Sequence, residues 1–405
     1  MRAAHWQSGT SLRCSPSPVT ARSPRRARVA SAGERREAPA RVAAAPSTTS
    51  SPAPGRLLGP PVPAPTATAP GVVEGYWQWD TAPTGVPQRI RYQHAPASTP
   101  TSSSSSAAAS STLPPALLLI HGFGGNADHW RKNTPALAAA GCDVWAIDLL
   151  GYGGSDKPRP PKTDPKTGAH VPPASLYNFS TWAAQCLAFA SSVIGARRPV
   201  FLITNSIGGL VGLQAALDAP AGTVAGVQLM NISLRALHVS KQAPPARPAV
   251  KALQWALRET PLGGLFFGQI ATPDGVTGVL RQCYKNKAAV SPDLVAAILA
   301  PAAADPAAAL PVFLDFISYS SGPLPEDLLA AVSARRPGLP VSIIWGAADP
   351  WEKVEWGRAL GDKGTYTCVE SFTEVDAGHC PMDEAPDKVN PLVVDFVRRH
   401  AASSS

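Results

Sequence analysis

The sequence lacks most of the features that mark a membrane-spanning, metal-binding or disulfide-stabilised protein. Its six cysteines form no C-x-x-C pair, and no two histidines have the spacing of metal ligands. The longest apolar runs, such as Ala116 to Ile120 and Pro199 to Ile203, are far shorter than a membrane span. We therefore expect no disulfide framework, no metal site and no transmembrane segment.

The folded part of the chain also lacks net charge. The formal charge of the whole sequence is +8, but residues 1–70 contain ten Arg against two acids, Glu34 and Glu37. Residues 71–405 contain 26 basic and 26 acidic side chains. A surface that binds nucleic acid needs an excess of Lys and Arg on the folded domain, so we expect no nucleic-acid partner.

The first 70 residues have the composition of a leader. They are rich in Arg, Ser, Ala and Pro, nearly free of acids, and lack the apolar core of a secretory signal. This composition is typical of an organelle transit peptide, and chloroplast and mitochondrion are both compatible with it. A disordered Pro-rich tail without a targeting role is the alternative.

After the leader, apolar segments of strand length alternate with segments of helix length. The strand-like segments are Leu117 to Ile120, Val144 to Ile147, Val200 to Ile203, Val224 to Met230 and Val341 to Trp345. Continuous apolar runs are typical of parallel strands that are buried on both faces. The sequence therefore predicts an α/β fold, with a mostly parallel central sheet and helices on both faces. The expected helices lie near Trp130 to Ala140, Tyr177 to Ile194 and Ile207 to Leu217.

The alternation predicts how the chain is divided. Residues 71–232 form the first part of the core, 233–338 form an inserted helical cap, and 339–405 complete the core. Residues 96–115, which are rich in Ser, Ala, Thr and Pro, are interpreted as a low-complexity hairpin insertion. Six apolar cap residues either face a pocket or, for most of them, form the cap's own core: Leu265, Phe266, Phe267, Ile270, Phe313 and Phe316.

A serine stands at a predicted strand-to-helix junction. The segment Phe201-Leu-Ile-Thr-Asn205-Ser206-Ile207-Gly208-Gly209 ends a buried strand and opens a helix. This is the setting of a nucleophile elbow, which holds Ser206 on a sharp turn and needs a small residue such as Gly208. Thr204 stands where the elbow usually has glycine. The alternative is that Ser206 only caps the helix.

A glycine-rich loop follows the strand that ends at Ile120. Its residues are His121, Gly122, Phe123, Gly124 and Gly125. In this position the backbone N–H groups of Phe123 and Ile207 could bind the oxyanion of a tetrahedral intermediate. A dinucleotide-binding loop is the alternative, but this run matches only the loose form G-x-G-x-x-A.

An acid and a histidine follow in the order that a catalytic triad requires. Asp349 comes after the strand Val341 to Trp345, and His379 follows a second strand near Phe372 to Val375. Open α/β sheets build their sites at such strand ends. We expect Ser206 to attack the substrate, His379 to transfer the proton and Asp349 to orient the imidazole. Asp376 is the nearby competitor for the acid role, and no carboxylate follows the strand that ends at Asn231.

From about residue 75 to 400 the sequence resembles the α/β-hydrolase superfamily. Asp148-Leu-Leu-Gly-Tyr-Gly-Gly-Ser-Asp156 is similar to its D-x-x-G-x-G-x-S loop, and Gly378-His-Cys-Pro-Met-Asp-Glu384-Ala-Pro386 to its G-H-x-P-x-x-E-x-P segment. The run from Ile120 to Lys132 and the N-S-I-G-G elbow most resemble plant and algal plastid hydrolases, the group that includes pheophytinase and chlorophyll dephytylase. The resemblance implies hydrolysis of a phytyl or other plastid lipid or pigment ester.

The sequence is therefore interpreted as a plastid serine esterase that forms an acyl-enzyme on a small hydrophobic ester. We expect it to need no metal or organic cofactor, and peripheral membrane contact is compatible with such a substrate. Two alternatives remain open. One is a serine-dependent carbon–carbon bond hydrolase, for which Arg235, Arg258 or Arg281 would bind the substrate carboxylate. The other is a ligand-binding receptor or scaffold that has this fold and little turnover.

Overall fold

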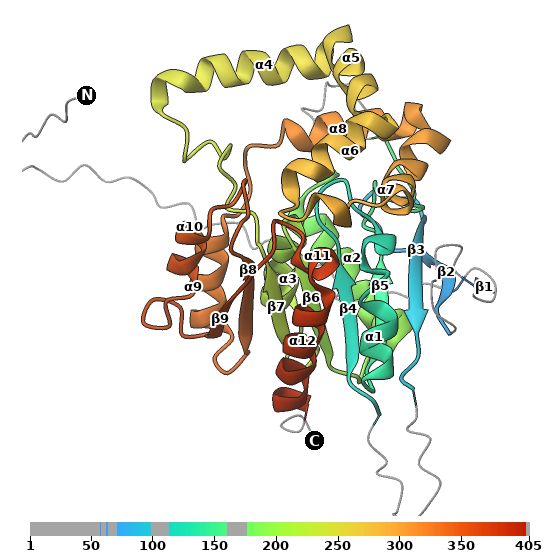
Figure 1. Ribbon diagram of the computed structural model, residues 1–405, viewed down its shortest axis with the longest axis vertical. Helices are drawn as coiled ribbons and strands as arrows, with labels where there is room; N and C mark the ends of the chain where they lie inside the picture. The colour runs from blue at the N-terminus through green and yellow to red at the C-terminus, as the bar shows by residue number, and fades with distance from the viewer. Residues whose placement is uncertain (1–56, 58–61, 64–70, 99–112, 160–175, 402–405) are drawn as a thin grey trace, which may run out of the picture. The chain divides into compact units, whose positions relative to one another are not determined.

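The computed structural model describes residues 57, 62–63, 71–98, 113–159 and 176–401. Its centre is a nine-stranded sheet with the order β1-β2-β3-β5-β4-β6-β7-β8-β9 (Figure 1). The strands are β1 (Val62–Pro63), β2 (Val73–Trp79), β3 (Gln88–Ala95), β4 (Ala116–Ile120), β5 (Asp143–Ile147), β6 (Val200–Asn205), β7 (Val224–Met230), β8 (Val341–Gly346) and β9 (Val369–Val375).

Six neighbouring strands run parallel, in the order β5-β4-β6-β7-β8-β9, whereas β1, β2 and β3 form an antiparallel edge. Every residue of β4, β6 and β8 is buried, as expected for strands that are covered on both faces. Alternate residues of β4 belong to two separate apolar clusters: Leu118 and Ile120 to one, Leu117 and Leu119 to the other. The structure confirms the predicted fold class.

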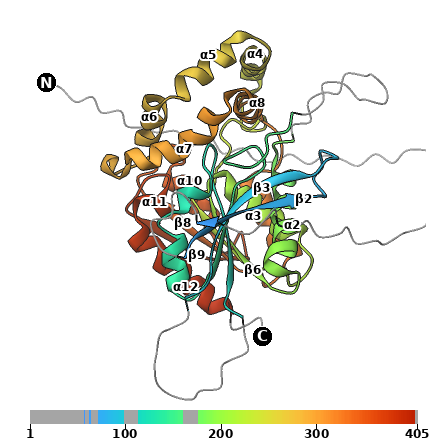
Figure 2. The same ribbon diagram turned by 90° about the vertical axis from the view of Figure 1, so that its right-hand side faces the viewer.

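Helices cover both faces of this sheet (Figures 1 and 2). One cluster includes residues of α2 (Phe179–Phe189), α3 (Ile207–Asp218) and α9 (Pro325–Arg335). The other includes residues of α1 (Thr134–Ala139) and α12 (Pro386–Ala401). Two short helices, α10 (Val354–Leu360) and α11 (Pro381–Glu384), follow β8 and β9.

Between β7 and β8 the chain forms six α-helices. They are α4 (Arg247–Glu259), α5 (Pro261–Ile270), α6 (Pro273–Cys283), α7 (Pro292–Ala304), α8 (Pro306–Ile317) and α9, with short 3-10 helices η3 (Pro244–Ala246) and η4 (Lys287–Ala289). The last helix, α9, differs from the expected cap, because its Leu328, Leu329 and Val332 are buried in the same cluster as α3. We therefore use the word cap for α4–α8.

No single helix among the described residues is long and apolar enough to cross a membrane, although α7 and α8 together, bent by 106°, have sufficient length and composition.

The predicted hairpin at 96–115 is wrong, although residues 99–112 themselves lie outside the described residues. The flanking strands β3 and β4 do not pair, because β5 lies between them and pairs with β3 in the antiparallel sense. Local composition carried no information about this long-range partner. The expected helix near Trp130 to Ala140 also differs, since the 3-10 helix η1 (Ala127–Trp130) precedes α1, which has Pro135 in its first turn.

Helix α2 is shorter than the expected helix Tyr177 to Ile194. Helix α2 ends at Phe189, and the following residues Ala190–Gly195 form a π-helix (η2). The sequence-predicted leader 1–70 also reaches too far, because Val62 and Pro63 pair with Val73 and Glu74 at the edge of the sheet. An edge strand tolerates proline, so the Pro-rich composition did not exclude pairing there. Most of the leader lies outside the described residues.

Candidate active site

Ser206 is the single residue between β6 and α3, and its backbone is strained. Its φ of 55° and ψ of −119° lie in a region that non-glycine residues rarely adopt. The turn is sharp because α3 starts against the end of β4. A Cβ atom at Gly208 would lie 2.6 Å from the carbonyl oxygen of Ile120 and 2.7 Å from that of His121. Glycine at 208 is therefore required by close backbone approach.

Thr204 is accommodated by a second glycine that the sequence reasoning missed. The threonine is fully buried, and its hydroxyl donates a hydrogen bond to the carbonyl of Gln228 at 2.9 Å. A Cβ atom at Gly212 would lie only 2.8 Å from Thr204 Cγ2. The space that the usual elbow glycine leaves on the strand is thus provided by Gly212 on the helix.

The structure brings Ser206, His379 and Asp349 together. His379 Nε2 lies 3.0 Å from Ser206 Oγ, and His379 Nδ1 lies 2.7 Å from Asp349 Oδ2. All three side chains are buried. The distances and order suit proton transfer from a serine hydroxyl through an imidazole that a carboxylate orients.

Asp349 is held by four donors, and the sequence reasoning missed the side chain of Asn231 among them. Its Oδ1 accepts the N–H groups of Trp351 and Glu352, and its Oδ2 accepts His379 Nδ1 and, at 2.7 Å, Asn231 Nδ2. Burial alone would raise the pKa of Asp349, but the hydrogen bonds from His379, Glu352 and Asn231 hold it below its ordinary value. The carboxylate therefore stays ionised beside the imidazole.

Asn231, the missed donor, joins two strand ends. Its amide oxygen accepts the N–H of Gly346 at the end of β8, while its Nδ2 reaches Asp349. Its φ is 44°, and the side chain is fully buried. In the sequence, Asn231 is a polar residue directly after β7. The prediction considered this position only for the acid of a triad, and asparagine is not an acid.

The glycine-rich loop after β4 lies against Ser206. A Cβ atom at Gly122 would lie 3.0 Å from Ser206 Cβ and from Asn205 Oδ1. The carbonyl of Gly122 accepts hydrogen bonds from His121 Nδ1 at 2.8 Å and from the Gly125 N–H at 3.1 Å. Because a trans peptide points its C=O and N–H in opposite directions, these bonds turn the Phe123 N–H away from the loop interior.

His121 is a neutral structural histidine. Its Nε2 accepts the N–H of Leu149, so the proton is on Nδ1, where it is donated to the Gly122 carbonyl. Burial lowers the pKa of His121. Gly124 has a φ of 69°, which favours glycine at the tip of the turn. Ile207 is the first residue of α3, so its N–H has no partner within that helix.

The histidine loop is attached both to the elbow and to the cap. Asn205 Nδ2 donates to the carbonyl of His379, and the His379 N–H donates to the carbonyl of Cys283 on α6. Glu384 accepts three backbone N–H groups, those of Gly378, Lys285 and Asn286. The competing carboxylate, Asp376, is exposed and forms an ion pair with Lys285 instead.

Aromatic side chains surround the glycine-rich loop. The Phe123 ring lies 4.9 Å from that of Phe316 and 5.6 Å from that of Phe313, measured between centroids. Of the six apolar residues considered for the cap, Phe313 and Phe316 thus reach the site. Phe267 is buried, whereas Leu265 and Phe266 are exposed.

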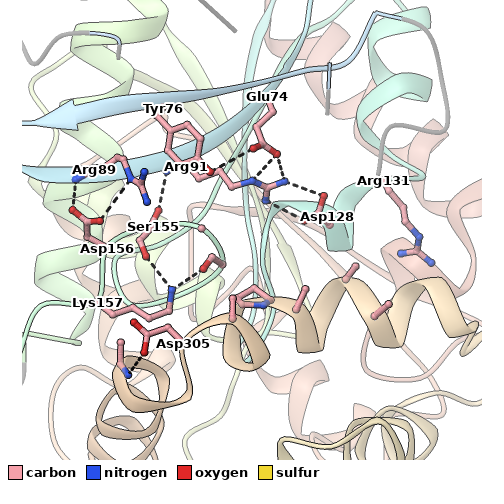
Figure 3. A pocket seen from close by; sticks show the side chains of 18 of the residues that line it. Glu74, Tyr76, Arg89, Arg91, Asp128, Arg131, Ser155, Asp156, Lys157 and Asp305 are labelled. Atoms are coloured by element: carbon pink, nitrogen blue, oxygen red, sulfur yellow. Dashed lines mark hydrogen bonds and ion pairs between the residues drawn. The ribbon is translucent and has the colours of Figure 1, made fainter. Parts of the chain in front are cut away.

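A separate hollow of about 1230 Å³ lies between β2, β3, residues 153–158, α7 and α8 (Figure 3). Its charged wall is internally paired: the buried Arg91 guanidinium contacts Glu74 at 2.6 Å, Asp128 at 3.0 Å and Asp148 at 3.2 Å. Ser206, Asp349 and His379 are not among its lining residues. Within the described ranges, no group of three or more His, Cys, Asp or Glu side chains could hold a metal ion.

Comparison with known proteins shows which family the chain belongs to. The sequence model of the alpha/beta hydrolase family matches residues 117–392. The chain belongs to this family. The esterase from the thermophile Thermogutta terrifontis superimposes with a TM-score of 0.55 and 19% identity, over 80% of this chain and 99% of the esterase, which shows the same alpha/beta hydrolase fold.

The chain is also similar in sequence to two curated proteins of named activity. The chloroplastic pheophytinase of Arabidopsis thaliana is 27% identical over 315 residues, which are 70% of this chain and 61% of the pheophytinase. The human 1-acylglycerol-3-phosphate O-acyltransferase ABHD5 is 25% identical over 287 residues, 69% of this chain and 76% of that protein. The chain thus spans less than two thirds of the pheophytinase.

Proposed function

We propose that this protein is a serine hydrolase that cleaves a carboxylic ester through an acyl-enzyme. The observation that supports this most strongly is the unbroken chain of contacts from Ser206 Oγ through His379 to Asp349, at 3.0 and 2.7 Å. The strained backbone at Ser206 supports the same role, because such strain is typical of a nucleophile elbow.

In the proposed mechanism Ser206 Oγ attacks the ester carbonyl carbon while its proton passes to His379 Nε2. The N–H groups of Phe123 and Ile207 stabilise the oxyanion, an effect typically worth about 3 kcal/mol per donor. The tetrahedral intermediate collapses, the C–O bond breaks, and the alcohol leaves with the proton from His379. A water molecule then attacks the acyl carbon and gives a proton to His379. The bond between the acyl group and Ser206 Oγ breaks, His379 returns the proton to Ser206 Oγ, and the acid leaves.

The surroundings of Ser206 favour an apolar substrate. The rings of Phe313 and Phe316 pack against that of Phe123, whose N–H is one of the proposed oxyanion donors. We therefore propose a phytyl ester or another plastid lipid or pigment ester, a choice that the similarity to a chloroplastic pheophytinase supports. The Arg-rich, acid-poor composition of residues 1–70 supports import into an organelle, and the similarity to a chloroplastic protein favours the plastid over the mitochondrion.

Two of the three arginines that would bind a dienol acid have other partners. Arg235 donates to the carbonyls of Tyr319 and Ser321, and Arg258 pairs with Asp315 at 3.5 Å. Arg281 is exposed. These contacts support an ester substrate over the carbon–carbon bond alternative.

Fluorophosphonate labelling tests the nucleophile. We expect the wild type to be labelled and Ser206→Ala to lose the label. Ser233→Ala is the matched control, because the Ser233 N–H binds the Ser206 carbonyl but its hydroxyl binds Glu352. Equal labelling of Ser206→Ala and wild type would contradict the assignment.

The ester class is tested by turnover. We expect multiple turnovers of short p-nitrophenyl esters, abolished in His379→Ala, and release of chlorophyllide or pheophorbide from the phytylated pigments. Activity on short esters without either pigment product would contradict the phytyl substrate. Tight pigment binding with no more than a single turnover would favour the receptor alternative.

A further inference from the structure

The large exposed apolar side chains of this protein are concentrated on two adjoining helices of the cap. Twelve such side chains occur in the described residues, and five of them lie between positions 253 and 266. We call four of them the α4–α5 face: Trp255 (62% exposed) on α4, and Leu262 (56%), Leu265 (68%) and Phe266 (43%) on α5. Leu253, two residues before Trp255, lies on another side of α4. Isolated exposed apolar residues need no explanation, but a contiguous group usually marks a binding surface.

The packing of helix α5 keeps its part of the face exposed. The helix has no charged residue, and Leu262, Leu265 and Phe266 occupy one side at i, i+3 and i+4. Gly263 and Phe267, on another side, are buried. A Cβ atom at Gly263 would lie within 1.9 Å of the Leu257 carbonyl, so α5 is packed tightly on α4. Figures 1 and 2 show α4 and α5 on the side of the cap away from the sheet.

Aromatic rings connect the face to the candidate active site. The centroid of exposed Phe266 lies 6.0 Å from that of Phe313, which lies 5.6 Å from that of Phe123 in the glycine-rich loop. Phe267 adds a contact with Phe313 at 5.3 Å. These rings extend from the α4–α5 face to Phe123, which follows Gly122, and Gly122 lies against Ser206. An apolar chain that runs from the face along these rings therefore contacts aromatic side chains up to the glycine-rich loop.

The charge of α4 indicates which surface would bind. Residues 247–270 contain Arg247, Lys251 and Arg258 but one acid, Glu259. Because Arg258 pairs with Asp315 on α8, the attraction for an anionic surface falls mainly to Arg247 and Lys251. A twofold dimer through this face would bring the same basic side chains of two copies together. An anionic lipid surface would instead attract them, and helices with Lys and Arg beside Trp, Phe and Leu are typical of membrane interfaces.

We propose that the α4–α5 face docks on an anionic lipid surface and that the apolar part of an ester enters the site from there, along Phe266 and Phe313. The inference deepens the proposed function and rests on it for the identity of the substrate. Docking places a water-insoluble ester beside its route to Ser206, and the basic side chains of α4 contribute attraction that salt screens.

The test is co-sedimentation of the full chain with vesicles of phosphatidylcholine and phosphatidylglycerol in equal amounts. We expect wild type to sediment and Leu262→Glu/Leu265→Glu to bind about a hundredfold more weakly, because two apolar side chains lose their burial. Val86→Glu is the matched control, since Val86 is 57% exposed but lies in the β2–β3 turn. Added salt should weaken wild-type binding, and vesicles of phosphatidylcholine alone should bind less.

Three outcomes would overturn the docking proposal. These are no sedimentation of wild type, an equal loss in Val86→Glu, or conversion of a dimer to a monomer by the double variant, which would make the face an interface between copies. Hydrolysis of a short soluble ester, measured on the same samples, separates the two proposals. Wild type that cleaves this ester without binding vesicles is a hydrolase without docking; wild type that binds without cleaving it retains docking alone.

Discussion

The loops at the strand ends around Ser206 differ from the outer helices of the cap in the kind of side chain that each buries or exposes. At the strand ends, polar side chains are buried and hydrogen-bonded. Asp349, for example, accepts four hydrogen bonds. On α4 and α5, five large apolar side chains are exposed. Hydrogen-bonded polar networks in the interior fix the positions of side chains, whereas exposed apolar side chains are stabilised when a binding partner covers them. The first region therefore fixes the positions of Ser206, His379 and Asp349, whereas the second leaves apolar surface uncovered.

The largest effect should come from the carboxylate behind His379. Asp349→Asn keeps the size of the side chain but removes the charge that orients the imidazole, so we expect kcat on a short ester to fall about 10⁴-fold. Asp376→Asn is the matched control, because that exposed carboxylate pairs with Lys285. A comparable loss in Asp376→Asn would contradict the proposal that Asp349 is the acid of the triad.

The contact between Thr204 and Gly212 tests how closely the strand-end region is packed. Thr204→Gly removes a buried hydrogen bond and methyl group, so the free energy of unfolding should fall by about 2 kcal/mol. Gly212→Ala should cost about 1–3 kcal/mol through overpacking against Thr204 Cγ2. Urea unfolding of both variants and of the double variant checks this. The double variant should lose less than the sum, and simple additivity would show that the two positions are independent.

Phe313 lies between the two regions. Phe313→Ala removes the ring between Phe266 and Phe123, so we expect kcat/KM for long-chain esters to fall about tenfold, as for loss of a buried apolar contact. Activity on short esters should change little. Leu237→Ala, at an exposed position elsewhere after β7, is the control. An equal loss for short and long esters would mean that Phe313 supports the oxyanion loop rather than the chain.

The smallest effect is expected from Glu352, three residues after Asp349. Burial raises the pKa of Glu352 above its ordinary value of 4.5, although the Leu234 N–H opposes the shift. A raised carboxyl pKa favours folding below the unfolded value, and that contribution is lost as pH rises through the folded one. Glu352→Gln should therefore raise the free energy of unfolding at pH 7 relative to wild type, with the difference shrinking at pH 4. Urea unfolding at both pH values measures it, and an unchanged difference would contradict the sign.

The sequence predicted best what depends on local patterns. Apolar runs located β4 to β8, and strand ends located Ser206, Asp349 and His379, which the structure brings within hydrogen-bonding distance. The misses depend on contacts between distant segments. Composition could not show that β3 pairs with β5, or that Gly212 makes room for Thr204. It also could not show that Asn231 would reach Asp349, because that contact joins the ends of two strands separated by the whole cap.

The attachment of the histidine loop to the cap makes the two a linked pair of equilibria. The Cys283 carbonyl holds the His379 N–H, and Glu384 holds the N–H groups of Lys285 and Asn286 together with that of Gly378. A ligand that changes the affinity for a second ligand across this junction is itself bound with an affinity that the second ligand changes by the same factor. A covalent adduct on Ser206 should then slow amide hydrogen exchange at Lys285 and Asn286, and a ligand that binds the cap and tightens the binding of a transition-state analogue should itself be bound more tightly, by the same factor, when that analogue is present.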